Sequence, residues 1–153
     1  MKGKKADREI LRKLKGNEVS YRSKDAFYGD FGNIAVTKWE RGTNFDEATF
    51  TKDGQVMEAF YDYNSKLAGT VQNKSFAGLP ANAQKFINEK YNNYAAGAVI
   101  LFDDNELNET DMILFGQQFD DADNYFVELK KAETKIIVQV NMSGDISYFT
   151  RIK

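Results

Sequence analysis

The sequence predicts an α+β fold built from two tandem units, each a helix followed by antiparallel strands, with the helices packed on one face of the sheet. Two observations lead to this prediction. A β-hairpin with an Asp-Gly turn is expected within residues 45–67, and its apolar pattern recurs 79 residues later, near the C-terminus. A helical pattern also precedes each hairpin. Two copies of this length are typical of a tandem duplication rather than of an open repeat array.

The N-terminal residues 1–24 are expected to form a basic segment, because they hold nine Lys and Arg against three Asp and Glu. We interpret this segment as solvated and flexible. No binding of nucleic acid is expected, since aromatic side chains do not interleave with the basic ones. Residues 25–153 are predicted to form a single domain, with one unit at about 25–74 and the other at about 79–153.

In the first unit, a short helix is expected from Ser23, whose hydroxyl can cap it, to Gly29 or Gly32. A strand at 35–40 leads into the hairpin. Asp53-Gly54 is typical of a two-residue hairpin turn, because Gly adopts positive φ without steric cost. The resulting alternation predicts a core face made of Ala48, Phe50, Met57, Ala59 and Tyr61.

The second unit is predicted to begin with a helix over residues 79–94, in which Pro80 suits the first turn. Strands are then expected at 98–102, 111–119, 124–131, 134–141 and 145–152. A shift of 79 residues keeps an apolar residue at each core-face position of the hairpin: Ala48 falls on Val127, Phe50 on Leu129 and Tyr61 on Val140.

The composition excludes several classes of site. The chain has 153 residues and no Cys or His, which rules out disulfides, thiol nucleophiles, histidine bases and the usual zinc sites. No apolar run approaches the ~20 residues of a membrane-spanning helix. No catalytic or cofactor motif stands out, so we expect a protein that is not an enzyme and needs no cofactor.

An acidic stretch offers the alternative function. Eight carboxylates and no Lys or Arg lie between residues 103 and 123. The candidate metal ligands are Asp103, Asp104, Asp120, Asp121 and Asp123, in the loops 103–111 and 120–124, and calcium is the ion that such oxygen donors suit. If residues 111–119 form one strand, the two loops lie ~25 Å apart. Two solvated loops are therefore the preferred interpretation, with a calcium-binding or metal-dependent hydrolytic protein as the alternative.

Aromatic side chains give the leading hypothesis for binding. Phe60 falls on the polar face of the hairpin, and the alternation places Phe126 on the same side. Trp39 and Phe149 are expected to join them. Exposed aromatic residues on an open sheet face are typical of protein-binding surfaces. The alternative, left open here, is that the N-terminal segment or a partner chain covers this face.

Short motifs of the first unit connect the chain to a known family: Phe31-Gly32-Asn33, Val36-Thr-Lys-Trp39-Glu40, Ala48-Thr-Phe50-Thr-Lys-Asp-Gly54 and Ala59-Phe-Tyr61-Asp, followed by Leu79-Pro80 and Ile87-x-x-x-Tyr91. Over roughly residues 25–153 the chain resembles the PepSY-like, β-lactamase-inhibitor-like family of Bacteroidetes. The resemblance implies a helix-backed antiparallel sheet and a periplasmic or secreted location. The expected function is a non-enzymatic envelope module that binds an unknown protein or peptide through the open sheet face.

Overall fold

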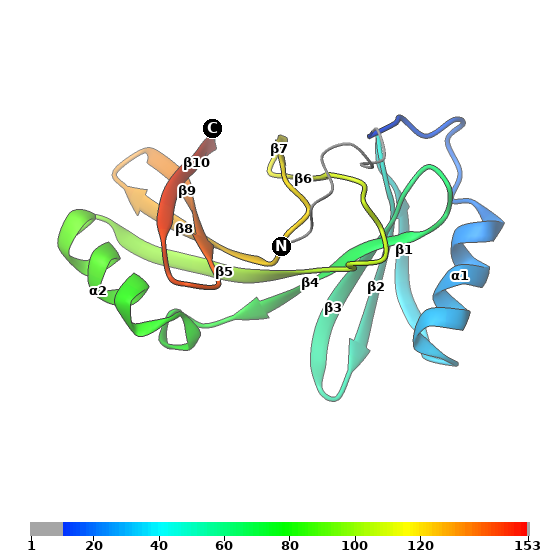
Figure 1. The fold of residues 1–153 in the computed structure, drawn as a ribbon, viewed down its shortest axis with the longest axis horizontal. Helices are drawn as coiled ribbons and strands as arrows, with labels where there is room; N and C mark the ends of the chain where they lie inside the picture. The colour runs from blue at the N-terminus through cyan, green and yellow to red at the C-terminus, as the bar shows by residue number, and fades with distance from the viewer. Residues whose placement is uncertain (1–10, 153) are drawn as a thin grey trace.

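The computed structural model describes residues 11–152, which form two α-helices and a curved antiparallel sheet (Figure 1). Helix α1 spans Tyr21–Phe31 and helix α2 spans Ala81–Lys90, the latter preceded by a 3-10 turn at Phe76–Gly78. Both helices lie on the same side of the sheet, which we call the helix face, and the opposite side is called the hairpin face. The predicted α+β class and its helix-backed arrangement are confirmed.

The main sheet has eight strands in the order β1-β2-β3-β4-β5-β8-β9-β10. Their bounds are β1 Val36–Arg41, β2 Asp46–Lys52, β3 Gln55–Tyr61, β4 Leu67–Lys74, β5 Ala95–Asp104, β8 Asn124–Lys131, β9 Thr134–Asn141 and β10 Ile146–Ile152. The order is α1 and four strands of this sheet, then α2 and the other four strands of this sheet, and β4 pairs with β5 to join the two units. The chain thus contains the tandem units that the repeated pattern predicts.

The Asp-Gly hairpin is the most completely predicted element. Asp53 and Gly54 both have positive φ, as a type I′ turn requires, and the pairings of Lys52 with Gln55 and of Ala48 with Ala59 match the expected register. The predicted core face packs under α1, where Phe27 contacts Phe50 with ring centroids 4.9 Å apart. The equivalent face of β8 and β9 packs in the same way under α2.

The start of α1 differs from the prediction. The N-cap is Ser20, whose hydroxyl accepts a hydrogen bond from the Arg22 N–H at 3.1 Å. Ser23, the expected cap, is buried inside the helix and donates instead to the carboxylate of Asp46 at 2.8 Å. Arg41 pairs with the other Asp46 oxygen at 2.6 Å. The hydrogen bond from Ser23 ties α1 to the beginning of β2, and the ion pair joins the end of β1 to the same residue.

Part of the basic N-terminal segment lies against the sheet, so the expectation of a solvated segment is wrong there. The Leu14 N–H donates to the Thr43 carbonyl at 2.8 Å, and Asn44 donates to the Arg12 carbonyl at 3.0 Å. Leu11 packs against the core on the hairpin face. Residues 1–10, which carry the rest of this prediction, lie outside the described residues.

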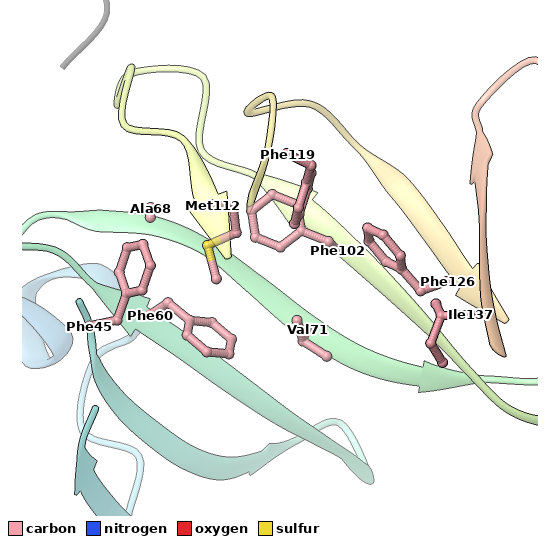
Figure 2. Packing of buried hydrophobic residues seen from close by; sticks show 9 residues of the cluster. All are labelled: Phe45, Phe60, Ala68, Val71, Phe102, Met112, Phe119, Phe126 and Ile137. Carbon is pink, nitrogen blue, oxygen red and sulfur yellow. The ribbon is translucent and has the colours of Figure 1, made fainter. Parts of the chain in front are cut away.

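The predicted strand at 111–119 is instead a small hairpin. Strands β6 (Met112–Leu114) and β7 (Gln117–Phe119) pair with each other around Phe115 and Gly116, which both have positive φ. This hairpin lies over the hairpin face of the main sheet (Figure 1). Met112 and Phe119 reach down from it between Phe60 on one side and Phe126 on the other (Figure 2). A third core therefore fills the hairpin face.

Candidate functional site

Three of the four predicted binding aromatics belong to this third core. Phe60 is 5% exposed and Phe126 is 1% exposed, and Phe149 is half-buried against Phe126 with centroids 4.8 Å apart. The prediction of an open sheet face is therefore wrong at its centre. The physical reason is the β6–β7 hairpin, whose Phe119 ring lies 5.0 Å from that of Phe126 and shields it from solvent.

Trp39, the fourth predicted residue, lies on the other side of the sheet. Its half-buried indole contacts Phe27 of α1 at a centroid distance of 5.9 Å and Tyr61 at 6.2 Å. The structure therefore does not bring Trp39 together with the other three aromatics. Together these positions show that the predicted aromatic set builds two separate cores.

Several exposed apolar side chains lie at the tips of loops, whereas others, such as Tyr21 and Tyr28, lie on α1. Leu107 is 95% exposed, in the connection of residues 105–111 between β5 and β6, which we call the Leu107 loop. Phe115, in the β6–β7 turn, is 43% exposed, and Tyr63, in the β3–β4 turn, is 37% exposed. Leucine is normally a core residue, so nearly complete exposure on one loop marks Leu107 as unusual.

Asp62 anchors the Leu107 loop through a buried polar network. Its Oδ2 accepts hydrogen bonds from Asn108 Nδ2 at 2.9 Å and from Thr110 Oγ1 at 3.1 Å. Its Oδ1 accepts the N–H groups of Asn64 and Lys66 and so shapes the β3–β4 turn. Asp62, Asn108 and Thr110 are all buried. Satisfied buried networks are rigid, because each broken bond would leave a polar group without water.

Asparagine side chains complete the anchoring of the loop. Asn105 Nδ2 donates to the Leu67 carbonyl at 2.8 Å, and Asn105 Oδ1 accepts the Leu107 N–H at 3.2 Å. Asn108 Nδ2 also donates to Leu67 at 3.0 Å, while its Oδ1 accepts the Thr110 N–H at 2.9 Å. In the sequence, the one signal that could have indicated this exposed loop is the lone apolar residue in Asn-Glu-Leu-Asn, within an acidic stretch.

The two acidic loops are closer together than the sequence predicted. Because residues 111–119 fold back as a hairpin, β5 and β8 pair directly, with Phe102 opposite Asn124. The Asp104 N–H donates to Asp123 Oδ1 at 2.7 Å. Partial burial of the carboxyl group, then the charges of Asp123 and Glu106, raise the pKa of Asp103 above its usual value. The expected separation of ~25 Å is thus wrong.

The remaining candidate metal ligands are spread over different environments. Asp104 and Asp121 are buried, whereas Asp103 and Asp120 are exposed. Within residues 11–152, no group of three or more carboxylates gathers closely enough to hold a metal ion. The calcium prediction for these loops stays a prediction.

A row of carboxylates on the first unit was not anticipated. Glu40 of β1 lies directly opposite Glu47 of β2, and Glu58 of β3 lies on the same face. Burial, then the charges of Glu58 and Glu40, raise the pKa of Glu47 to about 7, against the opposing effect of Lys38. Only the pairing of three strands brings these residues together, so no motif in the sequence indicates them.

Comparisons with known proteins identify the fold. A BLIP-like protein from Bacteroides fragilis superposes with a TM-score of 0.65 at 20% identity, covering 88% of this chain and 87% of that one. A DUF2874 family protein from Bacteroides uniformis gives 0.67 at 12% identity, with coverages of 88% and 90%. A Bacteroides eggerthii protein, provisionally described as periplasmic, gives 0.67 at 10% identity, with coverages of 88% and 90%.

No protein-family model and no curated protein sequence matches the chain. These three Bacteroides proteins are described without an enzymatic activity or a ligand. Among the described residues, neither helix has the length and apolar character needed to cross a membrane. The tandem units, the helix-backed sheet and the superpositions together show that this chain has the BLIP-like α+β fold found in these Bacteroides proteins.

Proposed function

We propose that this protein is a non-enzymatic binding module of the bacterial cell envelope that recognises a protein partner through the Leu107 loop. The observation that carries the proposal is the 95% exposure of Leu107 on a loop held by a buried polar network. The bare sheet face is not available for this role, because the β6–β7 hairpin covers its aromatic residues.

The energetics favour binding through a loop of this kind. Burying a leucine side chain against a partner contributes ~1.5–3 kcal/mol. Asp62, Asn105 and Asn108 hold the loop in place before binding, so little conformational entropy is lost on association. Glu106 and Glu109 flank Leu107 in the sequence, and their charges favour a partner with a basic rim around an apolar pocket.

Two separate observations support a location in the cell envelope. A structural relative from Bacteroides eggerthii is provisionally described as periplasmic. The motifs of the first unit resemble a family whose members are exported. Fractionation of the native organism, with antibodies against this chain, would test the location directly; recovery in the cytosolic fraction alone would contradict it.

Binding through the Leu107 loop can be tested by affinity purification with the full chain as bait. Envelope extract is passed over the wild-type protein and over Leu107→Asp, and bound proteins are quantified by mass spectrometry. Met142→Asp is the matched control, because Met142 is also an exposed apolar residue, 48% exposed in the β9–β10 turn. A partner should be retained by the wild type and by Met142→Asp and lost with Leu107→Asp. Equal retention by all three proteins would contradict the proposal.

The calcium-dependent or hydrolytic alternative depends on the acidic loops. What favours it is that β5–β8 pairing brings Asp103 and Asp123 together. Asp103→Asn would then abolish a calcium-induced rise in melting temperature or a turnover. Neither effect is expected if the acidic loops only shape the charge around Leu107.

A further inference from the structure

A second surface, at the opposite end of β5 from the Leu107 loop, has the features of a peptide-binding site. It lies where the C-terminal end of α2 meets the start of β5. A groove of about 180 Å³ opens there, with Phe76, Tyr91 and Tyr94 around it and Ile87, Ala96 and Leu129 as its floor. Ligand pockets for drug-sized molecules usually exceed ~300 Å³, so the groove suits a single apolar side chain.

The strand beside this groove has an open edge. Pairing between β4 and β5 begins at Lys74 and Val99, so residues Ala95–Ala98 extend beyond the end of β4. A register shift between Ala96 and Val99 also bends β5 against β8 at this point. All four residues from Ala95 to Ala98 are exposed, and in the described part of the chain no strand pairs with them on the β4 side.

This edge has one of the protections that sheet edges normally carry and lacks two others. Edge strands usually avoid unwanted pairing through charged side chains, proline or bulges. The irregularity of β5 against β8 is of the kind that the outermost strands, β1 and β10, also have. Ala95-Ala96-Gly97-Ala98, however, has no charged side chain and no proline. An incoming backbone could therefore approach β5 closely.

The charge around the groove selects the kind of peptide. Lys131 Nζ lies 5.7 Å from the centroid of the Tyr94 ring, and Lys90 Nζ lies 5.7 Å from that of Tyr91. No carboxylate lines the groove. The Glu128 carboxylate lies over Gly97 on the hairpin face, the opposite side of β5, where it pairs with Lys135 at 3.6 Å. The two lysines thus favour carboxylates next to an apolar side chain seated in the groove.

We propose that this site, the β5 notch, binds an extended acidic peptide that adds as a strand to Ala95–Ala98. One apolar side chain of the peptide enters the groove beside the Tyr91 and Tyr94 rings, which pack edge to face with their centroids 5.5 Å apart. Acidic neighbours of that side chain contact Lys90 and Lys131. Strand addition supplies affinity through backbone hydrogen bonds, and the pocket beside the edge supplies specificity.

The test uses a phage-displayed library of random dodecapeptides selected on the full chain. Enriched peptides should combine one large apolar residue with flanking Asp or Glu and should lack proline. A synthetic peptide of the enriched sequence should bind the wild type and lose about tenfold or more in affinity with Lys131→Glu, a difference of ~1.4 kcal/mol. Lys52→Glu is the matched control, because Lys52 is exposed beside the distant β2–β3 turn. It should bind like the wild type.

Two further measurements separate strand addition from a merely electrostatic attraction. Ala96→Trp fills the groove and should abolish peptide binding. A melting curve shows whether this variant folds. If it does not fold, the loss of affinity with Lys131→Glu takes its place as the test. N-methylation of alternate peptide bonds in the synthetic peptide should also abolish binding, since it removes the donors that pair with β5. Enrichment of basic sequences, equal binding by Lys131→Glu, or indifference to N-methylation would each overturn the proposal.

The proposals for the β5 notch and for the Leu107 loop can be refuted independently of each other. Leu107→Asp should leave peptide binding at the notch unchanged, and Lys131→Glu should leave the envelope partner of the Leu107 loop unchanged. If Leu107→Asp alone abolished peptide binding, the peptide site would belong to the Leu107 loop and the notch would be excluded.

Discussion

Replacing Asn108 by alanine is the sharpest test of how the Leu107 loop is held. The side chain of Asn108 donates to Asp62 at 2.9 Å and to the Leu67 carbonyl at 3.0 Å, and it accepts the Thr110 N–H at 2.9 Å. A hydrogen bond to a charged group contributes ~1.5–3 kcal/mol, and a buried donor left without a partner costs ~1–3 kcal/mol. Local opening of the loop lets water satisfy some of these groups, so we expect Asn108→Ala to lower the free energy of unfolding by about 2–3 kcal/mol.

Urea unfolding followed by fluorescence gives this quantity, because the chain has one tryptophan, Trp39, packed under α1. Hydrogen exchange of residues 105–111 should accelerate in Asn108→Ala even under native conditions. Asn92→Ala, at an exposed position after α2, is the control and should change stability by under about 0.5 kcal/mol. A loss below about 1 kcal/mol, with unchanged exchange in the loop, would refute the reasoning that the network fixes Leu107.

Phe60→Ala should lower the free energy of unfolding by about 3–5 kcal/mol in urea titrations, the usual cost of truncating a buried phenylalanine; an unchanged midpoint would contradict its place in the core. Gly69→Ala should lower the melting temperature strongly in circular dichroism, because the added Cβ would collide with the Phe102 ring and with the Asp103 backbone carbonyl. The backbone at Gly69 is not in the left-handed region, so the collision is the expected cause, and an unchanged melting temperature would contradict it. Burial, then the charges of Glu58 and Glu40, raise the pKa of Glu47 to about 7. Above about pH 4.5, Glu47 therefore still holds its proton in the folded chain, whereas in the unfolded chain it has released it. Wild-type stability should therefore fall, relative to Glu47→Gln, as pH rises from about 4.5 to about 7; parallel pH profiles of the two proteins would exclude this. Millimolar calcium should leave the melting temperature unchanged in a fluorescence melt, whereas a rise of several degrees would favour the calcium alternative.

Local patterns predicted the hairpins and their register well. The turn at Asp53-Gly54 restricts the backbone to a single arrangement, and the alternation on each side has only one face that can be buried. The β8–β9 turn at Ala132-Glu133 is also tight, and Ala132 has positive φ there. Neither alanine nor glutamate is typical of such a turn. There the apolar pattern of the flanking strands was the stronger signal.

Apart from the placement of Trp39, the errors in the candidate site came from a single element. Residues 111–119 contain Met-Ile-Leu-Phe, which favours one continuous strand, and the Phe115-Gly116 turn has no Asn or Asp to indicate it. Treating the segment as one strand separated the acidic loops and left the sheet face open. Both consequences are wrong because Met112 and Phe119 turn back onto the sheet. Such packing depends on contacts between distant residues, which a local pattern does not contain.

The two units differ most in one connection, and this difference decides where a partner could bind. In the first unit β1 and β2 are joined by residues 42–45, whereas the equivalent strands β5 and β8 are joined by residues 105–123. The longer connection supplies the hydrophobic cover for the hairpin face of both units, since Met112 and Phe119 share one cluster with Phe45 and Phe126. An insertion that buries the sheet aromatics also carries Leu107 out into solvent. In the proposed function, recognition therefore uses a small loop whose position the buried carboxylate of Asp62 controls, and not a broad apolar face, which would also attract nonspecific partners.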